Sequence, residues 1–448
     1  MNPPILVLTR DASLSPFASY LPELLRMEGL NWLSVQECSS LDGDVPLSPL
    51  VVLGAVDLDR REAEILASHV RQGGALLAAR PSPALMTAFD LPPAQPLPGG
   101  WSRGYVVLEE ASPVVAGLPW PVGGVQYFSH TLALQVGSGE PGSSGVSSRA
   151  PNPSGARGER VAAAAWLAPF SGQPTRFPAL VTLPFGAGRV VLVAYDPAEC
   201  AVVQQQGRPQ QASTGALPDF DGDGTFRPND LFLGQLDPAL RDVPQADLQR
   251  TLLLRAIEWL TEHQPLPRLW RFPNNAPAAI FLDGDSDNMR QEDFDLAIQT
   301  CDRYNAPFAT YLKTEHINML QASDERAARA RGHRFGLHPW AGPKPSVEEF
   351  HGVVQHDSAQ FAARYGYRPR VMRSHWVVWP GWVDTARTLQ AAGIQLDTNF
   401  TAGWGFKGGY VNGSGLPARF VNEAGVLLDL YEQSTISGDD SWLLPKAG

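Results

Sequence analysis

The sequence predicts a two-domain α/β protein, and three observations support this prediction. Its 448 residues exceed what one hydrophobic core usually organises, because single domains seldom grow beyond about 250–300 residues. Apolar residues make up 44% of the chain and charged residues 18%, which is ordinary for a globular protein. Short apolar runs alternate with amphipathic helical patterns in the first half, as in parallel βαβ units.

Composition excludes several function classes. The formal charge of -11 argues against a nucleic-acid partner, because such proteins gather Lys and Arg on one surface. No apolar run approaches the roughly 18 residues needed to span a bilayer. The N-terminus shows no export signal, so we expect a cytoplasmic protein. Cys38, Cys200 and Cys301 lie far apart in the sequence, which predicts neither disulfides nor a cysteine zinc site.

The first hundred residues predict a flavodoxin-like, doubly wound domain. Apolar runs predict strands and helical spacing predicts helices that end at glycines. The predicted strands are Ile5–Thr9, Trp32–Gln36, Pro49–Ala55 and Ala75–Ala79, and the predicted helices are Phe17–Gly29 and Asp59–Gln72. Later strands are predicted at Gly104–Leu108, Gln126–Leu134, Ala162–Leu167, Ala179–Leu183 and Gly188–Ala194, with a helix at Asp247–His263. A proline-rich segment, 264–276, predicts a linker between domains 1–263 and 277–448.

In topology, residues 4–194 resemble class I glutamine amidotransferase-like domains, including the trehalose-utilisation type. In that family a nucleophilic cysteine follows a central strand. Here the strand Ala75–Ala79 is followed by Arg80-Pro81-Ser82, without a cysteine. We therefore expect a non-catalytic domain with a structural or carbohydrate-contacting role.

An acidic segment, Asp219–Asp230, has the spacing of a calcium loop. Carboxylates stand at positions 1, 3, 5 and 12, Gly224 stands at position 6, and a backbone carbonyl is available at position 7. The corresponding candidate calcium ligands are Asp219, Asp221, Asp223, Thr225 and Asp230. The last is Asp where Glu is usual, and no amphipathic helix precedes the loop. The alternative is a solvated acidic turn without an ion.

The second domain begins with chemistry at the end of a strand. The apolar run Ala278–Leu282 predicts a strand, and Asp283, Asp285 and Asp287 follow it at every second position. Side chains two apart on extended backbone share one face. Gathered carboxylates are costly unless a cation neutralises them or one stays protonated. The alternative is a solvated acidic turn.

Two later segments favour a metal site. Phe335-Gly336-Leu337 delivers His338 at its end, and Val371-Met372 delivers Arg373 and His375. One Asp and two His form a suitable set of ligands for zinc that leaves a position open for water. A single His is usually structural, but three successive strand ends that each present such a group are harder to explain by chance.

These motifs resemble those of polysaccharide deacetylases (the NodB-homology superfamily, carbohydrate esterase family 4). Asp283-Gly284-Asp285, Phe335–His338 and Arg373 match its first three motifs in order, and Leu389–Asn399 matches the passage after them. The resemblance implies a (β/α) barrel with Asp283 as base, Asp285 and His338 as metal ligands, and Arg373 orienting the base. It also implies a divalent metal, zinc first with cobalt or nickel as alternatives, and an N-acetylated carbohydrate substrate.

The chain also departs from this family. The position of the second ligand His holds Gly342, so His375 is the preferred replacement, ahead of His351 and His356, which lie in a predicted helix. The family's terminal His has no counterpart, so the barrel is expected to be incomplete at its C-terminus.

The indoles of Trp340, Trp376 and Trp379 lie near these motifs in the sequence and predict sugar stacking, with a place in the core as the alternative. The main hypothesis is a metal-dependent deacetylase acting on amide bonds. The alternatives are a catalytically degenerate carbohydrate-binding or scaffolding protein, and an amidase acting on a small non-sugar substrate.

Overall fold

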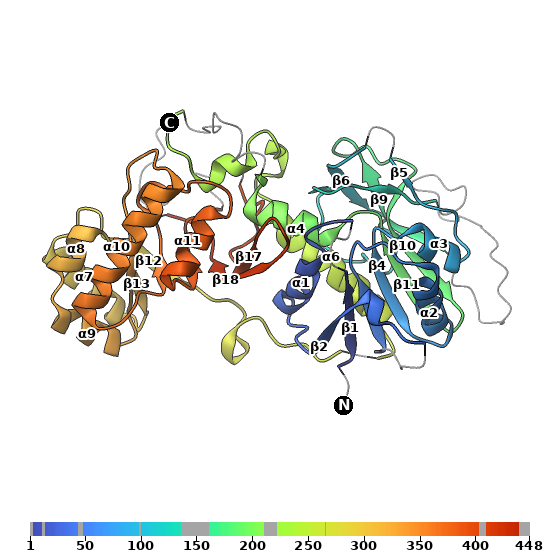
Figure 1. Ribbon diagram of the computed structural model, residues 1–448, viewed down its shortest axis with the longest axis horizontal. Helices are drawn as coiled ribbons and strands as arrows, with labels where there is room; N and C mark the ends of the chain where they lie inside the picture. The colour runs from blue at the N-terminus through green and yellow to red at the C-terminus, as the bar shows by residue number, and fades with distance from the viewer. Residues whose placement is uncertain are drawn as a thin grey trace. The chain divides into compact units, whose positions relative to one another are not determined.

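The computed structural model describes residues 3–10, 14–43, 48–97, 100–135, 161–209, 222–264, 266–402 and 409–438. These residues form two compact units, each built around its own sheet (Figure 1). Unit 1 comprises Met1–Gln204, Pro244–Arg271 and Glu423–Val426, and unit 2 comprises Gln205–Val243, Phe272–Asn422 and Leu427–Gly448. Both units mix helices with parallel-rich sheets, so the predicted α/β class is confirmed.

Unit 1 contains a nine-stranded sheet in the order β2-β1-β3-β4-β11-β10-β9-β6-β7. The pairs from β2 to β11 are parallel, and those from β11 to β7 are antiparallel. The parallel strands are β1 (Ile5–Thr9), β2 (Leu33–Glu37), β3 (Leu50–Leu53), β4 (Ala75–Ala79) and β11 (Gly188–Val193). The others are β6 (Gly104–Leu108), β7 (Val125–Tyr127), β9 (Ala162–Ala168) and β10 (Pro178–Phe185), and β5 (Gln95–Pro96) pairs separately with β8 (Leu132–Ala133).

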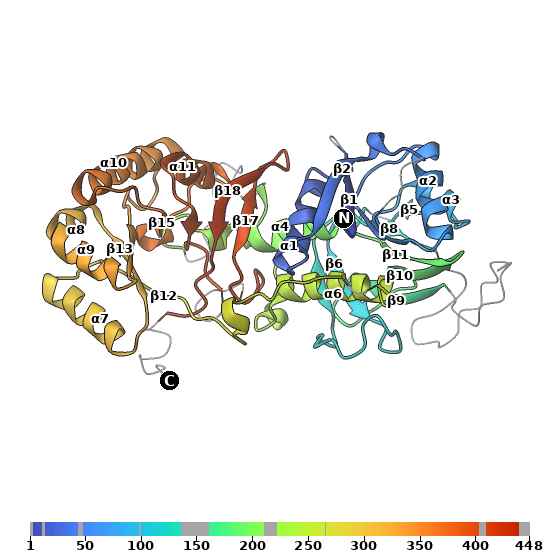
Figure 2. The same cartoon turned by 90° about the horizontal axis from the view of Figure 1, so that it is seen from below.

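The helices of unit 1 are α1 (Leu21–Met27), α2 (Arg60–Arg71), α3 (Pro83–Ala88), α4 (Pro197–Gln206), which ends two residues into unit 2, and α6 (Gln245–Leu260). Helix α2 begins at a capping box in which Asp59 and Glu62 accept each other's backbone N–H, satisfying two donors at the helix start. Helices α2 and α6 both pack on β4 and β11 (Figure 2). Cys38 and Cys200 are buried, so the described part of unit 1 presents no accessible thiol.

Unit 2 contains a seven-stranded sheet in the order β12-β13-β14-β15-β16-β18-β17. Strands β12 (Leu282–Asp285), β13 (Phe308–Leu312), β14 (Arg334–Leu337), β15 (Val371–Met372), β16 (Leu396–Asp397) and β18 (Leu427–Glu432) are parallel. Strand β17 (Ala418–Val421) is antiparallel to β18. The carboxyl ends of six strands therefore lie along one edge, and the loops that follow them can share a site.

The helices of unit 2 are α7 (Gln291–Arg303), α8 (Thr314–Met319), α9 (Ala322–Ala330), α10 (Val347–Tyr365) and α11 (Asp384–Ala392). The longest, α10, begins at a Ser346–Glu349 capping box and is followed by its C-cap residue Gly366, whose φ is 79°. Glycine adopts this left-handed conformation without steric cost. Across the described residues of both units, the helices are too short or too polar to cross a membrane.

Two features of unit 2 differ from the sequence-based expectation. The strand predicted at Ala278–Leu282 begins at Leu282 instead, and Ile280 before it is 86% exposed. The acidic segment was expected in the first domain, whereas its described part, residues 222–230, lies in unit 2. The second difference arises because Phe226 and Phe232 are buried, and Phe232 packs edge-on against Phe400 of unit 2.

Two glycines of unit 2 give opposite predictions for substitution by alanine. A Cβ at Gly336 in β14 would lie 2.3 Å from the carbonyl oxygen of Val371, so Gly336→Ala should lower the free energy of unfolding by about 1–3 kcal/mol. Gly352 lies exposed in α10, and a Cβ there would meet no atom within 4 Å, so Gly352→Ala should raise it by up to about 1 kcal/mol. Denaturant unfolding measures both changes. Equal effects of the two substitutions would contradict the close approach of β14 and β15.

Candidate metal centre

The candidate site is built from the ends of three parallel strands in unit 2. Asp285 ends β12 and Asp287 follows two residues later, His338 directly follows β14, and Arg373 and His375 follow β15. Backbone hydrogen bonds continue the strand pairing past these ends: His338 N–H donates to Leu312 O (2.9 Å), and Arg373 N–H donates to Leu337 O (3.0 Å). The backbone therefore fixes where each functional side chain starts.

Side chains alternate along the segment after β12. Asp285 and Asp287 are partly exposed, whereas Ser286 between them is 1% exposed. The Ser286 hydroxyl accepts from the backbone N–H of Lys313 (3.0 Å) and hydrogen-bonds His316 Nδ1 (2.8 Å). Because Ser286 is held in the interior, its two acidic neighbours point to the other side.

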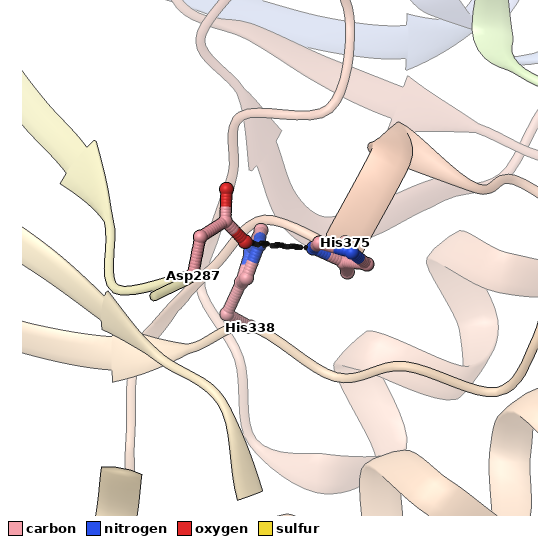
Figure 3. A group of neighbouring side chains, drawn as sticks. All are labelled: Asp287, His338 and His375. Carbon is pink, nitrogen blue, oxygen red and sulfur yellow. Dashed lines mark hydrogen bonds and ion pairs between the residues drawn. The ribbon is translucent and has the colours of Figure 1, made fainter. Parts of the chain in front are cut away.

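Three side chains converge on one point (Figure 3). Asp287 Oδ1 lies 2.8 Å from His375 Nδ1 and 3.2 Å from His338 Nε2, and the two imidazole nitrogens are 3.1 Å apart. His338 is fully buried, and the rings of the two histidines meet edge to face. Among the described residues, this is the group of three whose ligand atoms all lie within 4.8 Å of one another.

The hydrogen bonds of His338 define its tautomer. Its Nδ1 lies 2.8 Å from the backbone carbonyl oxygen of Arg373. Because that oxygen only accepts hydrogen bonds, Nδ1 carries the proton of the neutral ring, and Nε2 presents a lone pair to Asp287 and His375. Metal-ligating histidines are commonly oriented in this way by a carbonyl group.

The three ligand atoms suit a divalent cation. Nε2 of His338 and Oδ1 of Asp287 present lone pairs to each other, and Nδ1 of His375 lies within 3.1 Å of both. A proton on Nδ1 of His375, or a cation between the three atoms, relieves the repulsion. Ligands placed about 2.0–2.2 Å from a tetrahedral zinc ion are roughly 3.3–3.6 Å apart, so the observed separations of 2.8, 3.1 and 3.2 Å need to widen by only a few tenths of an ångström. Burial, reinforced by His338, lowers the pKa of His375 despite the nearby Asp287 carboxylate, which favours the neutral imidazole that metal binding requires.

Arg373 holds the other two carboxylates of the Asp283–Asp287 series. Its guanidinium donates to Asp283 Oδ2 (2.8 Å) and to Asp285 Oδ1 (3.2 Å). Burial opposes the charge of Arg373, but Asp285 and Asp283 outweigh it, so the pKa of the guanidinium is raised. Asp283 also accepts from the Tyr311 hydroxyl (3.1 Å). Asp285 Oδ1 is 3.6 Å from His338 Nδ1, the nitrogen that faces away from Asp287 and His375.

A cavity of about 330 Å³ opens beside these residues. Its lining includes Asp285, Asp287, His338, His375, Trp376 and Arg227. Asp283 is not part of the lining. Of the two carboxylates that Arg373 holds, Asp285 is therefore the one that faces the cavity.

The three predicted sugar-stacking tryptophans have different environments. Trp376 is 52% exposed and Trp340 is half-buried, and their rings meet at 4.9 Å. The prediction that Trp379 stacks on a sugar is wrong, because its side chain is fully buried and stacks on Phe420 at 5.5 Å. Its indole N–H donates to the Trp382 carbonyl oxygen (2.8 Å), so Trp379 belongs to the core.

The described part of the predicted calcium loop makes other contacts. Both oxygens of Asp223 accept from the Arg227 guanidinium (3.0 and 2.6 Å). Hydrogen bonds from Arg227, followed by the Thr225 backbone N–H, lower the pKa of Asp223 to about 2. Asp230 Oδ2 accepts from the Arg227 backbone N–H (2.7 Å). Asp219 and Asp221 lie outside the described residues.

The two histidines ranked behind His375 as ligands have partners outside the site. His351 and His356 lie on α10, where their rings contact Thr388 and Gln360. His333 is buried and contacts Asp302 (3.0 Å).

Two residues of the site were not predicted from the sequence. Asp287 was placed third in the acidic series but was not chosen as a ligand, and Arg227 was not identified. The alternation of Asp283, Asp285 and Asp287 was the available signal for Asp287, whereas Arg227 has no comparable signal.

Comparisons with known proteins give only distant likenesses. No family model matches the chain, and no curated protein matches its sequence. A polysaccharide deacetylase structure from Mycobacterium smegmatis matches 37% of this chain and 60% of its own, with 12% identity and a TM-score of 0.28. An exo-β-1,4-mannosidase from an Opitutaceae bacterium matches 44% of this chain and 32% of its own (15% identity, TM-score 0.28). The Xyl-CE4 domain of a xylanase from a Trinervitermes trinervoides hindgut metagenome matches 25% and 51% (14% identity, TM-score 0.20). At these TM-scores the likenesses carry no functional argument.

A buried carboxyl pair lies next to Arg373. Asp397 in β16 and Glu432 in β18 are direct partners across the sheet, and they are 0% and 6% exposed. Burial raises the pKa of Asp397 to about 6. Burial, together with the charge of Asp397, raises the pKa of Glu432 well above its usual value. The folded protein therefore holds a proton on this pair where the unfolded chain has released it.

This proton makes stability depend on pH. Above the unfolded Glu pKa of about 4.3 the folded state binds more protons, so the free energy of unfolding should fall as pH rises, by up to about 1.4 kcal/mol per pH unit. Glu432→Gln does not titrate and can still donate to Asp397. Its stability should therefore exceed that of the wild type increasingly from pH 4 to pH 7 in denaturant unfolding. A constant difference between the two proteins over this range would contradict the shared proton.

Proposed function

We propose that the chain is a metal-dependent hydrolase of amide C–N bonds, of the deacetylase type, acting on an N-acetylated carbohydrate. The observation that carries this proposal is the convergence of Asp287, His338 and His375 beside Asp285, which Arg373 holds at the cavity wall. A metal site with three protein ligands keeps a position open for chemistry. A carboxylate next to such a site can serve as a general base.

Asp287, His338 and His375 would hold the ion. Two nitrogens and one oxygen favour zinc, with cobalt or nickel as alternatives of similar ligand preference. When bound, a divalent ion polarises a carbonyl oxygen and makes a water molecule more acidic. His338 is oriented for this task by the Arg373 carbonyl group.

We assign the general base to Asp285 in place of Asp283, and the acidic ligand to Asp287 in place of Asp285. Both roles thus move two residues along the Asp283–Asp287 series, with the alternation of its side chains unchanged. Asp285 lines the cavity, whereas Asp283 is held by both Tyr311 and Arg373. In this position Asp285 would remove a proton from water, while the Arg373 guanidinium, which donates to its Oδ1, keeps the carboxylate oriented.

The carbohydrate part of the proposal rests on the exposed indole of Trp376 and on the half-buried Trp340 next to it. Indole faces pack well against the apolar faces of sugar rings. We also propose that unit 2 is an incomplete barrel of the deacetylase type. For unit 1 we propose a flavodoxin-like domain without catalytic activity.

Substitutions of Asp285 and Asp287 test these roles. Asp285→Asn should keep bound zinc near one equivalent but reduce acetate release by about 10²–10⁴-fold, because it removes the base. Asp287→Ala should lose the metal together with activity. Elemental analysis and acetate release from N-acetylated oligosaccharides measure the two effects, and Asp295→Asn on the exposed face of α7 serves as a control.

The outcomes separate the alternatives. Loss of metal in Asp285→Asn with retention in Asp287→Ala would contradict the role assignment. A metal-loaded protein that binds oligosaccharides but releases no acetate would favour the degenerate binding protein. Release of acid from small acetamides alone would favour the amidase.

A further inference from the structure

The turn that carries the third ligand has an unfavourable backbone conformation. Trp376 and Val377 have φ values of 59° and 50°, in the left-handed region that non-glycine residues avoid. A β-branched residue such as Val377 is a particular outlier there. Conformations of this kind cost of order 1–3 kcal/mol each and persist only where surrounding contacts fix them. The position of His375 therefore depends on whatever holds this turn.

Part of the support comes from the turn's own surroundings. The Val377 N–H donates to the Ser374 carbonyl oxygen (2.9 Å), and the His375 N–H donates to Pro339 O (3.0 Å). The Ser374 hydroxyl donates to Val378 O (2.8 Å). These bonds fix both ends of the turn but leave the carbonyl group of Trp376 for another donor.

Arg227 supplies that donor from a distant part of the sequence. Its Nε–H donates to the Trp376 carbonyl oxygen (3.0 Å), while its two terminal nitrogens donate to the two oxygens of Asp223. One guanidinium thus joins the turn to the acidic segment through three hydrogen bonds. The Arg227 side chain is 15% exposed, whereas that of its partner Asp223 is 45% exposed, so the guanidinium is largely covered but the carboxylate remains in contact with solvent.

The segment that carries Arg227 is itself fixed. The Arg227 backbone N–H donates to Asp230 (2.7 Å). The Phe226 side chain is buried, and its carbonyl oxygen accepts from the Trp379 N–H (3.0 Å). Arg227 therefore contacts the turn from a segment that is itself held by hydrogen bonds.

We propose that Arg227, held by Asp223, is a positioning residue that keeps the strained Trp376–Val377 turn in the conformation that presents His375 to the metal. This inference rests on the proposed metal centre and assigns it a further residue. It gives the acidic segment a role other than calcium binding, because Asp223 orients a guanidinium. Lysine cannot replace Arg227 here. The planar guanidinium donates to both Asp223 oxygens and to the Trp376 carbonyl oxygen at once, whereas a single ammonium group cannot reach all three.

Metal binding by the full-length protein tests the inference without relying on activity. Co²⁺ alone is titrated into the metal-free wild type, Arg227→Met, Arg227→Lys and Asp223→Asn, and binding is followed by visible absorption. Both Arg227 variants should bind Co²⁺ about 10–100-fold more weakly, as for other residues that orient a metal ligand, and with an altered ligand-field spectrum. Asp223→Asn should shift affinity in the same direction by a smaller factor.

Arg290→Met is the matched control, because Arg290 also pairs with an aspartate, Asp293, but on the exposed start of α7. This variant should bind Co²⁺ as the wild type does. Thermal unfolding of the metal-free proteins shows whether each variant folds. If Arg227→Met folds poorly, Arg227→Lys still tests the inference, because it retains the charge and most of the aliphatic side chain.

Wild-type affinity and an unchanged spectrum in either folded Arg227 variant would overturn the inference and leave the metal centre intact. A wild type that binds no Co²⁺, or that binds it equally after His338→Ala, would overturn the metal centre and the role of Arg227 with it. A Co²⁺ affinity that falls only in proportion to a lower unfolding temperature, with the spectrum preserved, would also contradict a positioning role.

Discussion

Crowding of carboxylates at one edge of the unit 2 sheet is the constraint on which the rest of the site depends. Parallel strands end at the same edge, so Asp283 and Asp285 from β12 and Asp397 from β16 all approach Arg373. Like charges at such distances repel strongly where water is scarce. One buried guanidinium meets two of these carboxylates directly.

The remaining negative charge is accommodated in two different ways. The pair Asp397 and Glu432 is buried and retains a proton. Asp287 is instead partly exposed and faces two imidazoles whose nitrogens lie within 3.2 Å of it. Protonation suits a carboxyl pair sealed in the core, whereas a cation suits a carboxylate that opens onto a cavity.

Much of the fold could be predicted because its local signals agree. Ile5–Thr9 and Ala75–Ala79 are strands with the predicted bounds, since short apolar runs between helices are typical of buried parallel strands. The meeting of His338 and His375 was also expected from their places after successive strands. The choice between Asp285 and Asp287 was not predictable, because residues two apart share a face and only the point where β12 ends decides which one reaches the histidines.

Other features depend on contacts between distant segments, which no local pattern encodes. Trp376 and Trp379 lie close together in the sequence, yet Trp379 is buried and Trp376 is 52% exposed. The sequence around Asp223 has the spacing of a calcium loop, but the guanidinium of Arg227, four residues later, donates hydrogen bonds to both oxygens of that carboxylate. A spacing motif specifies which side chains are near one another, and tertiary packing decides which partner they take.

The most direct test of the central claim is a crystal structure of the protein soaked with zinc, with the ion located by its anomalous scattering. The account predicts one ion within about 2.0–2.2 Å of Asp287 Oδ1, His338 Nε2 and His375 Nδ1, with Asp285 still bound to Arg373. An ion coordinated by Asp285 in place of Asp287, or the absence of an anomalous peak at this position, would contradict it.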